Sequence, residues 1–389
     1  MKIGFFSETY LPVIHGVTIS IETFRKELES MGHKVYIYTL DIPGYKDKTP
    51  NVFRFKSIRI IKNPELRQLQ PALHLKPVRA SLEEIHKLKL DIVHAHTPFS
   101  LGVLAKSVSK EQKIPMVYTH HTDYPEYIKF YWKDKIILPR LMKVYTRWFS
   151  NLSNGIIAPS LKIKRYLRGY GVNKKIPIYV LQTGIDLNLF KKSPAAGFLV
   201  RRKLGISPQA KVLICVGRIG QEKNVEFIIR AFGEISKDRE GIFLMMVGEG
   251  PFFESLKKIV KDSGLDKKVI FTGRISHDEI KDYYNAADLF VFASYTDTQG
   301  IVIIEAMACG LPVVALKDDA FSDMIADGKN SFMVNKQSEK IFAQKVNQLL
   351  GDKELYRKFS SAAIKQAAAF SKENMAKKLI SVYKSLLKK

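Results

Sequence analysis

The chain alternates short apolar runs with amphipathic stretches, and it completes this alternation twice. In the first half the apolar runs lie at Ile3–Phe6, Lys34–Leu40, Ile92–His96, Met116–Thr119, Gly155–Ala158 and Tyr179–Leu181. In the second half they lie at Lys211–Val216, Ile242–Val247, Val269–Thr272, Leu289–Ala293 and Val313–Ala315. Apolar strands separated by helices are typical of parallel sheets that are covered on both faces. The pattern therefore predicts the α/β class, with two Rossmann-like, doubly wound parallel-sheet domains in tandem.

The length of 389 residues exceeds what one hydrophobic core usually organises, which also favours two domains. A segment with linker composition, Gly184–Gly197, separates the two series of strands. We therefore expect a first domain over residues 1–186 and a second over residues 187–370. The remaining residues, 371–389, have the pattern of an amphipathic helix with Met375, Leu379, Val382 and Leu386 on one face.

Composition narrows the class of protein further. No stretch approaches the ~18 apolar residues that a membrane span needs. An acid, Glu8, follows the first apolar run almost at once, which is unlike a signal peptide. Cys215 and Cys309 both lie in apolar surroundings, so we predict buried small hydrophobic residues in a reducing cytoplasm, with no disulfide and no metal ligation.

The charge of the chain is strongly positive. Lys and Arg number 63 against 38 Asp and Glu, which gives a formal net charge of +25. An excess of this size indicates an anionic partner, either a nucleic acid or an acidic membrane surface. Between Ile128 and Lys175 there are twelve basic residues and one acid, Asp134, so the excess is concentrated.

Part of this basic segment has the pattern of an amphipathic helix. Ile137, Leu141, Tyr145 and Trp148 recur at helical spacing, with Arg140, Lys143 and Arg147 alongside. Basic and aromatic residues on one helix are typical of helices that lie in a lipid interface. We therefore expect Arg140, Lys143, Arg147 and Trp148 to bind an anionic membrane surface; the alternative is a helix that buries its apolar stripe in the domain core. A second basic cluster consists of Arg54, Lys56, Arg59, Lys62 and Arg67.

Histidines gather where predicted strands of the first half end. His94 and His96 end the third strand, and His120 and His121 follow the fourth. Ligands of doubly wound folds bind beyond the carboxyl ends of the strands, so these side chains are candidates for a binding site. They can also be read as a metal cluster, but successive strand residues point to opposite faces, so His120 and His121 cannot easily share an ion. We therefore predict no metal site.

The segment Ser294–Ala315 carries the strongest functional pattern. It places Asp297 and Glu305 on either side of Gly300, which begins an apolar, alanine-rich helix, with Glu305 expected about two turns into the helix. A helix N-terminus exposes unpaired N–H groups and favours an anion, and the two acids can bind sugar hydroxyls beside it. A nucleotide-sugar combines both features, so we expect one to bind here.

Three further residues suit the phosphates of such a ligand. Arg218 follows the first strand of the second half and Lys223 begins the next helix, so the two can clamp a diphosphate. Gly16 lies where a loop meets the first helix and would let backbone N–H groups approach a phosphate. The alternatives are that Lys223 pairs with Glu222 or Glu226 on a solvated helix face, and that Gly16 is a plain turn residue.

Together these motifs resemble the retaining family 4 glycosyltransferases of the GT-B fold. The match includes Ala306, Ala308, Gly310, Pro312 and Val313 after the acid pair, the Gly217–Asn224 segment and the Gly248–Pro251 turn. The family usually has Glu where this chain has Asp297. The resemblance implies a hexosyltransferase with its donor in the second domain, its acceptor in the first, and the terminal helix packed back on the first domain.

The resemblance also implies a role for each site residue. Arg218 and Lys223 would hold the diphosphate, Gly16 would face it, and Glu305 would bind the ribose. Asp297 and Thr298, with backbone N–H groups of Gln299, Gly300 and Ile301, would hold the sugar. His121 would contact the sugar near the reacting carbon, whereas His120 would pack. No cofactor is required, because the nucleotide-sugar is a substrate, although Mg²⁺ or anionic lipid could stimulate the enzyme.

Two details point to one branch of the family. Thr298-Gln299-Gly300 replaces the commoner Gly-Phe-Gly, and His121–Tyr127 reads His-Thr-x-Tyr-x-x-Tyr; both resemble members that glucosylate diacylglycerol. The chain is then expected to move glucose from UDP-glucose to diacylglycerol, as a peripheral protein on the inner face of the cell membrane. Open alternatives are another acceptor, such as phosphatidylinositol or a soluble sugar, and another donor, such as GDP-mannose. A nucleic acid is not expected as a partner, because zinc knuckles, glycine-interleaved basic runs and RNP-like aromatic pairs are absent from the sequence.

Overall fold

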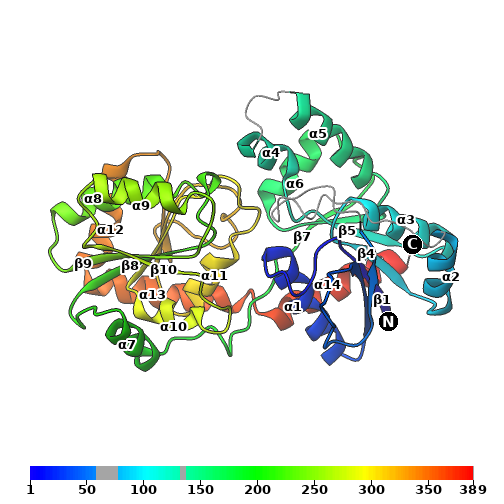
Figure 1. Ribbon diagram of the computed structural model, residues 1–389, viewed down its shortest axis with the longest axis horizontal. Coiled ribbons are helices and arrows are strands. Elements are labelled where there is room, and N and C mark those ends of the chain that lie inside the picture. Colours follow the sequence, from blue (N-terminus) through cyan, green and yellow to red (C-terminus); the bar gives the residue numbers. More distant parts are fainter. Residues whose placement is uncertain (58–77, 132–136, 389) are drawn as a thin grey trace. The chain divides into compact units, whose positions relative to one another are not determined.

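The computed structural model describes residues 1–57, 78–131 and 137–388, and these form two compact units (Figure 1). The first unit comprises Met1–Gly184 together with Lys372–Lys389, and the second comprises Ile185–Ser371. The chain therefore passes between the units twice, after Gly184 and after Ser371.

Within the described ranges, the first unit holds a seven-stranded sheet in the order β3-β2-β1-β4-β5-β6-β7, with parallel pairing throughout. Its strands are β1 (Lys2–Phe6), β2 (Lys34–Leu40), β3 (Val52–Phe55), β4 (Ile92–Ala95), β5 (Met116–Thr119), β6 (Gly155–Ala158) and β7 (Ile178–Val180). Its helices are α1 (Gly16–Ser30), α2 (Val78–Lys87), α3 (Ser100–Gln112), α4 (Tyr124–Tyr131), α5 (Ile137–Ser150), α6 (Leu161–Gly169) and α14 (Lys372–Leu387). Ile3 of β1 lies between Val35 of β2 and Ile92 of β4 and is fully buried, as expected for a strand covered on both faces.

The second unit, in the part that the structure describes, holds a six-stranded parallel sheet in the order β10-β9-β8-β11-β12-β13. Its strands are β8 (Lys211–Val216), β9 (Ile242–Val247), β10 (Val269–Gly273), β11 (Leu289–Phe292), β12 (Val313–Leu316) and β13 (Ser331–Val334). Its helices are α7 (Pro194–Lys203), the 3-10 helix η2 (Gln221–Lys223), α8 (Val225–Lys237), α9 (Phe253–Asp262), α10 (Ile280–Ala286), α11 (Ile301–Ala308), α12 (Glu339–Gly351) and α13 (Lys353–Ala368). The prediction of two parallel-sheet α/β domains is confirmed, and Cys215 and Cys309 are both buried and unbridged.

Three elements differ from the sequence prediction. The strands β3 and β13 were not predicted. Each has four residues and lies at the edge of its sheet, where the strand pairs with a neighbouring strand on one side only. In β3, Phe53 is exposed and Arg54 interrupts the apolar run. The helix α7 begins inside the segment that was predicted to be a linker, because Pro194 occupies the first turn, where proline is well tolerated.

The terminal helix α14 packs on the first unit. Its face formed by Met375, Leu379, Val382 and Leu386 is buried, as the spacing of these residues predicts. The hydroxyl of Tyr383 lies 2.7 Å from Nδ1 of His94, and Lys372 pairs with Glu27 of α1 at 3.2 Å. The last helix is thus fixed by apolar burial and by polar contacts to β4 and α1.

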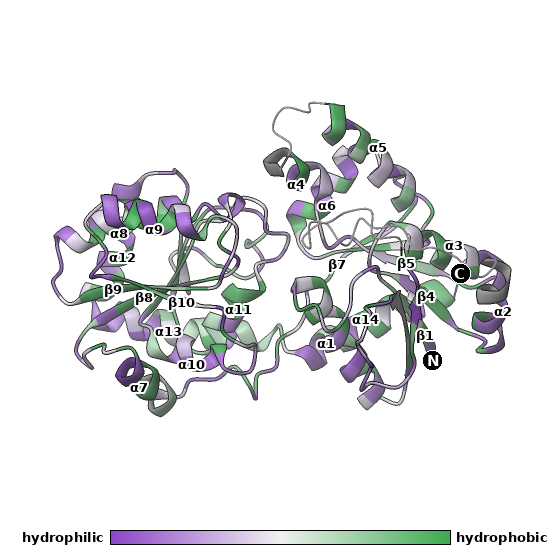
Figure 2. Cartoon of the chain, viewed as in Figure 1, coloured by the Kyte–Doolittle hydropathy of each residue, from purple (hydrophilic) through white to green (hydrophobic). Residues whose placement is uncertain are grey.

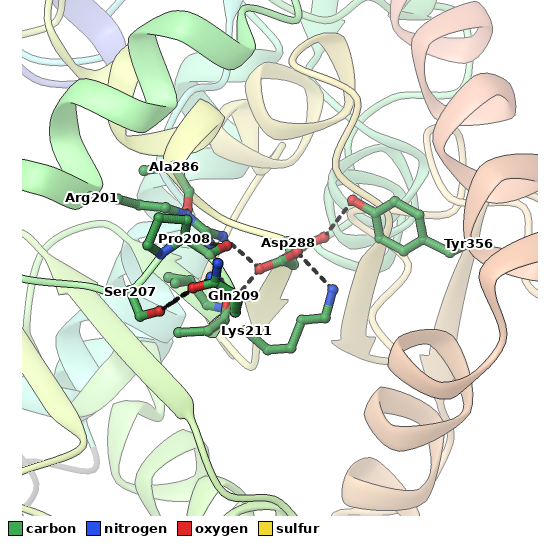
Figure 3. Close-up of polar contacts among 10 residues, drawn as sticks. Arg201, Ser207, Pro208, Gln209, Lys211, Ala286, Asp288 and Tyr356 are labelled. Carbon is green, nitrogen blue, oxygen red and sulfur yellow. Dashed lines mark hydrogen bonds and ion pairs between the residues drawn. The ribbon is translucent and has the colours of Figure 1, made fainter.

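Asp288 anchors the end of the second sheet that lies opposite the strand carboxyl ends (Figure 3). Its Oδ2 accepts hydrogen bonds from Nη2 of Arg201 at 2.7 Å and from the backbone N–H of Val212 at 2.8 Å. Its backbone carbonyl accepts one from the hydroxyl of Tyr356 at 3.0 Å. Arg201 lies on α7 and Tyr356 on α13, so Asp288 joins these two helices to β8 and β11. It thereby stabilises the end of the sheet opposite the functional loops.

Candidate active site

Two loops of the second unit bring the predicted anion-binding residues together. One follows β8 and carries Arg218 and Lys223; the other follows β11 and carries Asp297. Because β8 and β11 are neighbours in the sheet, the two loops start side by side. The backbone N–H of Tyr295 donates to the carbonyl oxygen of Glu222 at 3.2 Å and joins the loops directly.

Lys223 and Asp297 form an ion pair across these loops. The Nζ atom of Lys223 lies 3.0 Å from both Oδ1 and Oδ2 of Asp297. The alternative, in which Lys223 pairs with Glu222 or Glu226, is wrong: Glu222 pairs with Arg218, and Glu226 pairs with Arg230. The acid that the sequence assigned to the sugar therefore contacts a cation that the sequence assigned to the phosphates.

Arg218 is held by an acid that the sequence analysis did not select. Its Nη1 donates to Oε1 of Glu222 at 2.5 Å, and the Glu222 side chain is buried. A Cβ at Gly220 would lie 2.2 Å from Oε2 of Glu222, so this glycine makes room for the carboxylate. The four-residue spacing from Arg218 to Glu222 was the available signal, but the sequence analysis considered Glu222 only as a possible partner of Lys223.

Gly300 begins α11 in a conformation that only glycine accommodates well. Its φ is +74°, and a Cβ would lie 2.8 Å from the Phe321 ring. As the residue before the helix, Gly300 supplies no side-chain cap to the first N–H groups of α11. Because the helix begins at Ile301, Glu305 lies one turn into it, not two as expected. Thr298 and Gln299 lie in the same loop, and Gln299 is buried.

Glu305 is buried and oriented by two residues that the sequence did not indicate. The hydroxyl of Tyr284, on α10, donates to Oε2 at 2.8 Å. The Nε2 atom of His277, in the loop after β10, lies 3.6 Å from Oε1. The strand β11 lies between both residues and Glu305 in the sequence, so no local sequence pattern indicates that they are in contact. Their contacts fix the carboxylate in one orientation, in which it can accept hydrogen bonds from the hydroxyl groups of a ligand.

The Gly248–Pro251 turn has a packing role. A Cβ at Gly248 would lie 1.9 Å from the carbonyl oxygen of Gly217, and one at Gly250 would lie 2.3 Å from that of Ile219. The backbone N–H of Ile219 donates to the carbonyl of Glu249 at 2.9 Å. The two glycines therefore let this turn support the loop that carries Arg218.

In the first unit, His15 caps the helix that Gly16 begins. Its Nδ1 accepts hydrogen bonds from the N–H groups of Val17 and Thr18 at 3.2 and 3.5 Å, so Nε2 carries the ring proton and donates it to Oγ1 of Thr9 at 2.6 Å. Burial lowers the pKa of His15 to about 4, which keeps the ring neutral. A Cβ at Gly16 would meet no atom within 4 Å, so packing does not require this glycine, and its approach to a phosphate stays a prediction.

Glu8, directly beyond β1, is a buried acid with a structural role. Its Oε1 accepts hydrogen bonds from the N–H of Leu101 at 2.5 Å and from Oγ of Ser100 at 3.1 Å, and Oε2 accepts one from the hydroxyl of Thr97. Burial raises the pKa of the Glu8 carboxyl, against these hydrogen bonds, which lower it. The Glu8 carboxylate thereby accepts hydrogen bonds at the N-terminus of α3 and links the end of β1 to the end of β4.

His121 lies beyond β5 and contacts another of the predicted histidines. Its Nε2 is 3.0 Å from Nδ1 of His96, and the two rings stack with their centroids 5.3 Å apart. Burial, together with the neighbouring His120 and His15, lowers the pKa of His121 to about 3. The imidazole is therefore neutral at physiological pH and acts as a hydrogen-bonding group, without a charge.

The other two histidines have partners of their own. His94 is hydrogen-bonded through both ring nitrogens, to Tyr383 at 2.7 Å and to Oγ1 of Thr119 at 2.6 Å. His120 is bonded to the hydroxyl of Tyr118 at 2.9 Å and is buried, as a packing residue would be. Across residues 1–57, 78–131 and 137–388, no group of three or more His, Cys, Asp or Glu side chains is placed to hold a metal ion.

Apolar residues recur along α5 (Figure 2), and four of them form an exposed stripe. Ile137 is 70% exposed, Leu141 57%, Val144 54% and Trp148 47%. Arg140, Lys143 and Arg147 are exposed on the same helix. Burial of the stripe in the core, the alternative left open by the sequence, is wrong. The prediction that Tyr145 belongs to this stripe is wrong. Its hydroxyl donates to the carbonyl of Pro98 at 2.8 Å, so the side chain points inward, and Val144 continues the exposed stripe in its place.

The two described residues of the second basic cluster, Arg54 and Lys56, differ in their surroundings. Arg54 donates from Nε to Oδ2 of Asp47 at 2.7 Å and also bonds the carbonyl oxygens of Leu40 and Leu11. It therefore stabilises the loops around β2, while Lys56 is exposed. Arg59, Lys62 and Arg67 lie outside the described residues. None of the helices in the described ranges has the length and hydropathy needed to span a bilayer.

Comparison with known proteins accounts for both units. Residues 14–189 match the family described as Glycosyltransferase Family 4, and residues 199–366 match Glycosyl transferases group 1. Alpha-monoglucosyldiacylglycerol synthase of Streptococcus pneumoniae is 34% identical over 333 residues, which cover 84% of this chain and 74% of that protein. The protein of the same name from Acholeplasma laidlawii is 33% identical over an alignment of 404 residues, which covers 100% of this chain and 98% of the relative.

Solved structures give the same fold. HepE of Anabaena, crystallised in complex with UDP, superposes with a TM-score of 0.80 at 22% identity and covers 99% of this chain and 100% of its own. Sucrose-phosphate synthase from Thermosynechococcus elongatus has a TM-score of 0.80 at 20% identity and covers 99% of this chain and 98% of its own. The sequence relatives and the shared fold lead to one conclusion: the chain belongs to the family 4 glycosyltransferases of the GT-B fold.

Proposed function

We propose that the protein is a retaining hexosyltransferase that moves glucose from UDP-glucose to diacylglycerol on the cytosolic face of the membrane. Two relatives more than 30% identical over most of the chain are named for the synthesis of monoglucosyldiacylglycerol. The observation that carries the lipid acceptor is the outer face of α5, where bulky apolar side chains and cations are exposed together. A soluble acceptor gives no reason for such a face, whereas a lipid acceptor requires the enzyme to reach a membrane.

In this proposal the second unit binds the donor. Arg218 and Lys223 hold the diphosphate, and the oriented carboxylate of Glu305 accepts hydrogen bonds from the ribose hydroxyls. The uncapped N-terminus of α11 adds backbone N–H groups and the positive end of the helix dipole. Asp297 and the loop that contains Thr298 and Gln299 face the sugar. Arg218 and Lys223 also stabilise the negative charge that develops on the departing diphosphate, which removes the need for a metal ion.

The first unit supplies the acceptor side. His121, whose low pKa keeps it neutral and whose ring is oriented by His96, contacts the sugar, and Gly16 leaves space for the phosphate. The departing phosphate takes the proton of the acceptor hydroxyl on the same face of the sugar, so the anomeric configuration is retained. The cations of α5 attract an anionic leaflet, each contributing about 1 kcal/mol, and the apolar stripe inserts into the interface.

A screen of donors and acceptors tests the proposal. The purified full chain is incubated with UDP-glucose or GDP-mannose, in combination with diacylglycerol, phosphatidylinositol or a soluble sugar, and the products are identified by mass spectrometry. The proposal requires UDP-glucose and diacylglycerol to give the fastest transfer, with an α-linkage in the NMR spectrum of the product. Transfer to the soluble sugar alone would refute the lipid acceptor, and a β-linked product would refute retention.

A further inference from the structure

The two cations assigned to the diphosphate are both paired with acids, but the two pairs differ. Glu222, the partner of Arg218, has only 5% of its side chain exposed. Asp297 and Lys223 are 18% and 24% exposed. The acid of the first pair is therefore buried, although Arg218 itself is 27% exposed, whereas the acid of the second pair borders solvent, where an entering ligand can reach it.

The Lys223–Asp297 pair is fixed by the backbone as well as by its charges. The N–H of Lys223 donates to the carbonyl of Gly220 at 3.0 Å, which closes the 3-10 turn. The bond from Tyr295 to the carbonyl of Glu222 holds the neighbouring loop two residues before Asp297. Both side chains therefore extend from fixed backbone positions, and both carboxylate oxygens of Asp297 lie 3.0 Å from Nζ of Lys223.

A diphosphate bound by Lys223 would come close to the Asp297 carboxylate. A phosphate oxygen bonds an ammonium nitrogen at about 2.8 Å, so the two anions would compete for one cation at a separation within about 6 Å. Removal of Asp297 would relieve this repulsion but would also leave the Lys223 side chain less ordered. Repulsion between full charges at this range is the larger of the two effects, because only one flexible side chain is ordered by the pair.

The repulsion is stronger for the product than for the substrate. The terminal phosphate of a free nucleoside diphosphate has a second pKa of about 6 and carries an extra charge near neutral pH. In the nucleotide-sugar this oxygen is esterified, and the sugar brings hydroxyl groups that donate hydrogen bonds to a carboxylate. An acid at this position therefore favours the nucleotide-sugar over the nucleotide.

We propose that Asp297 and Lys223 form a latch that the donor opens. Lys223 exchanges Asp297 for the diphosphate, and the released carboxylate accepts hydrogen bonds from the sugar. After transfer the sugar is gone, Asp297 competes again for Lys223, and the nucleoside diphosphate is released. This inference rests on the donor site of the proposed function and adds to it a discrimination between substrate and product.

Calorimetric titration of the full chain with UDP and with UDP-glucose, without acceptor, tests the latch. Asp297→Asn is expected to bind UDP about three- to tenfold more tightly than the unsubstituted protein. The ratio of UDP-glucose affinity to UDP affinity should fall by at least the same factor. Unchanged or weaker UDP binding, or an unchanged ratio, would overturn the latch. Asp297→Ser serves as the second variant if Asp297→Asn does not fold.

Two controls separate the latch from other effects. Uridine has no phosphate, so Asp297→Asn should leave its affinity unchanged; an altered uridine affinity would overturn the charge-based explanation. Glu234→Gln removes an acid from an exposed pair with Lys237 on α8, with the same change in net charge. If it tightened UDP binding as much as Asp297→Asn, net charge would explain the result and the latch would be wrong.

The failure of the latch and the failure of the proposed function are distinguishable. An unsubstituted protein that binds neither UDP nor GDP would refute the proposed donor site itself. A protein that binds UDP normally, but whose Asp297→Asn variant binds it no more tightly, would refute only the latch.

Discussion

The hydroxyl of Tyr284 donates a hydrogen bond of 2.8 Å to Oε2 of Glu305 and orients a buried carboxylate at the start of α11. Tyr284 lies on α10, so the orientation of Glu305, which is proposed to bind the ribose, depends on a second helix. The relationship separates two effects: loss of the carboxylate itself, and loss of its orientation alone.

Replacement of Glu305 should therefore cost more than replacement of Tyr284. Glu305→Ala removes the proposed ribose contacts and should lower kcat/KM for UDP-glucose by more than about a hundredfold. Tyr284→Phe removes only the orienting hydroxyl and should raise KM about three- to tenfold with little change in kcat. Steady-state kinetics with varied UDP-glucose measure both. Equal effects of the two substitutions, or a normal KM for Tyr284→Phe, would contradict the assignment of Glu305.

His121 should act as a neutral group. Burial lowers its pKa to about 3, so its protonation state does not change between pH 5 and pH 9. His121→Ala should lower kcat about tenfold or more, through loss of a hydrogen bond to the reacting sugar, without altering the shape of the pH–rate profile. His96→Phe, which removes the 3.0 Å contact to His121, should give a smaller loss of the same kind. An ionisation that disappears from the profile of His121→Ala would show that the ring titrates during the reaction.

Buried histidines should make the fold sensitive to acid. Burial lowers the pKa of both His15 and His120 to about 4, whereas an unfolded histidine titrates near 6.5. Below about pH 6.5 the unfolded chain therefore binds protons that the folded protein does not, and the free energy of unfolding falls as the pH falls toward 4. We expect a loss on the order of 1–2 kcal/mol per histidine between pH 7 and pH 5, measured by urea unfolding at both values.

His120→Gln provides the matched control for this effect. It keeps a polar side chain near the hydroxyl of Tyr118 but removes one titrating group. The difference in unfolding free energy between the two pH values should shrink by the share of one histidine. If the variant and the unsubstituted protein lose the same amount on acidification, His120 does not contribute to the acid sensitivity.

The cations of α5 should set the affinity for anionic membranes. Arg140→Ala, Lys143→Ala and Arg147→Ala together should weaken binding to phosphatidylglycerol vesicles by about a hundredfold, at about 1 kcal/mol per charge. The matched control replaces three exposed lysines of α13, Lys353, Lys358 and Lys365, with alanine, for the same change in net charge. Vesicle sedimentation measures both proteins. Equal losses would indicate attraction by overall charge, without a specific role for α5.

The sequence predicted those features that short segments encode. The strands were predictable because parallel strands buried on both faces are apolar along most of their length. The edge strand β3 was missed because it is partly exposed and Arg54 interrupts it, whereas β13 is buried but has only three apolar residues. The start of α11 was predictable from Gly300 and its two acids. The outer stripe of α5 was predictable apart from Tyr145, where a shift of one residue, about 100° around a helix, separates an inward from an outward side chain.

Contacts between distant segments were not predictable from the sequence. The pairing of Lys223 with Asp297 joins residues 74 positions apart, and the contact of His96 with His121 joins residues 25 positions apart. Glu222 reads as a helix-surface acid until the fold buries it against Gly220. In each case the residue types were visible, but their partners depended on which strands become neighbours in the sheet.

Transfer of label from radioactive UDP-glucose to lipid tests the central claim most directly. The full chain is incubated with vesicles of diacylglycerol in phosphatidylglycerol, and the chloroform-soluble product is resolved. We predict a labelled glycolipid that is lost with Glu305→Ala and reduced in vesicles of neutral lipid. Release of UDP without any labelled lipid would contradict the claim that diacylglycerol is the acceptor.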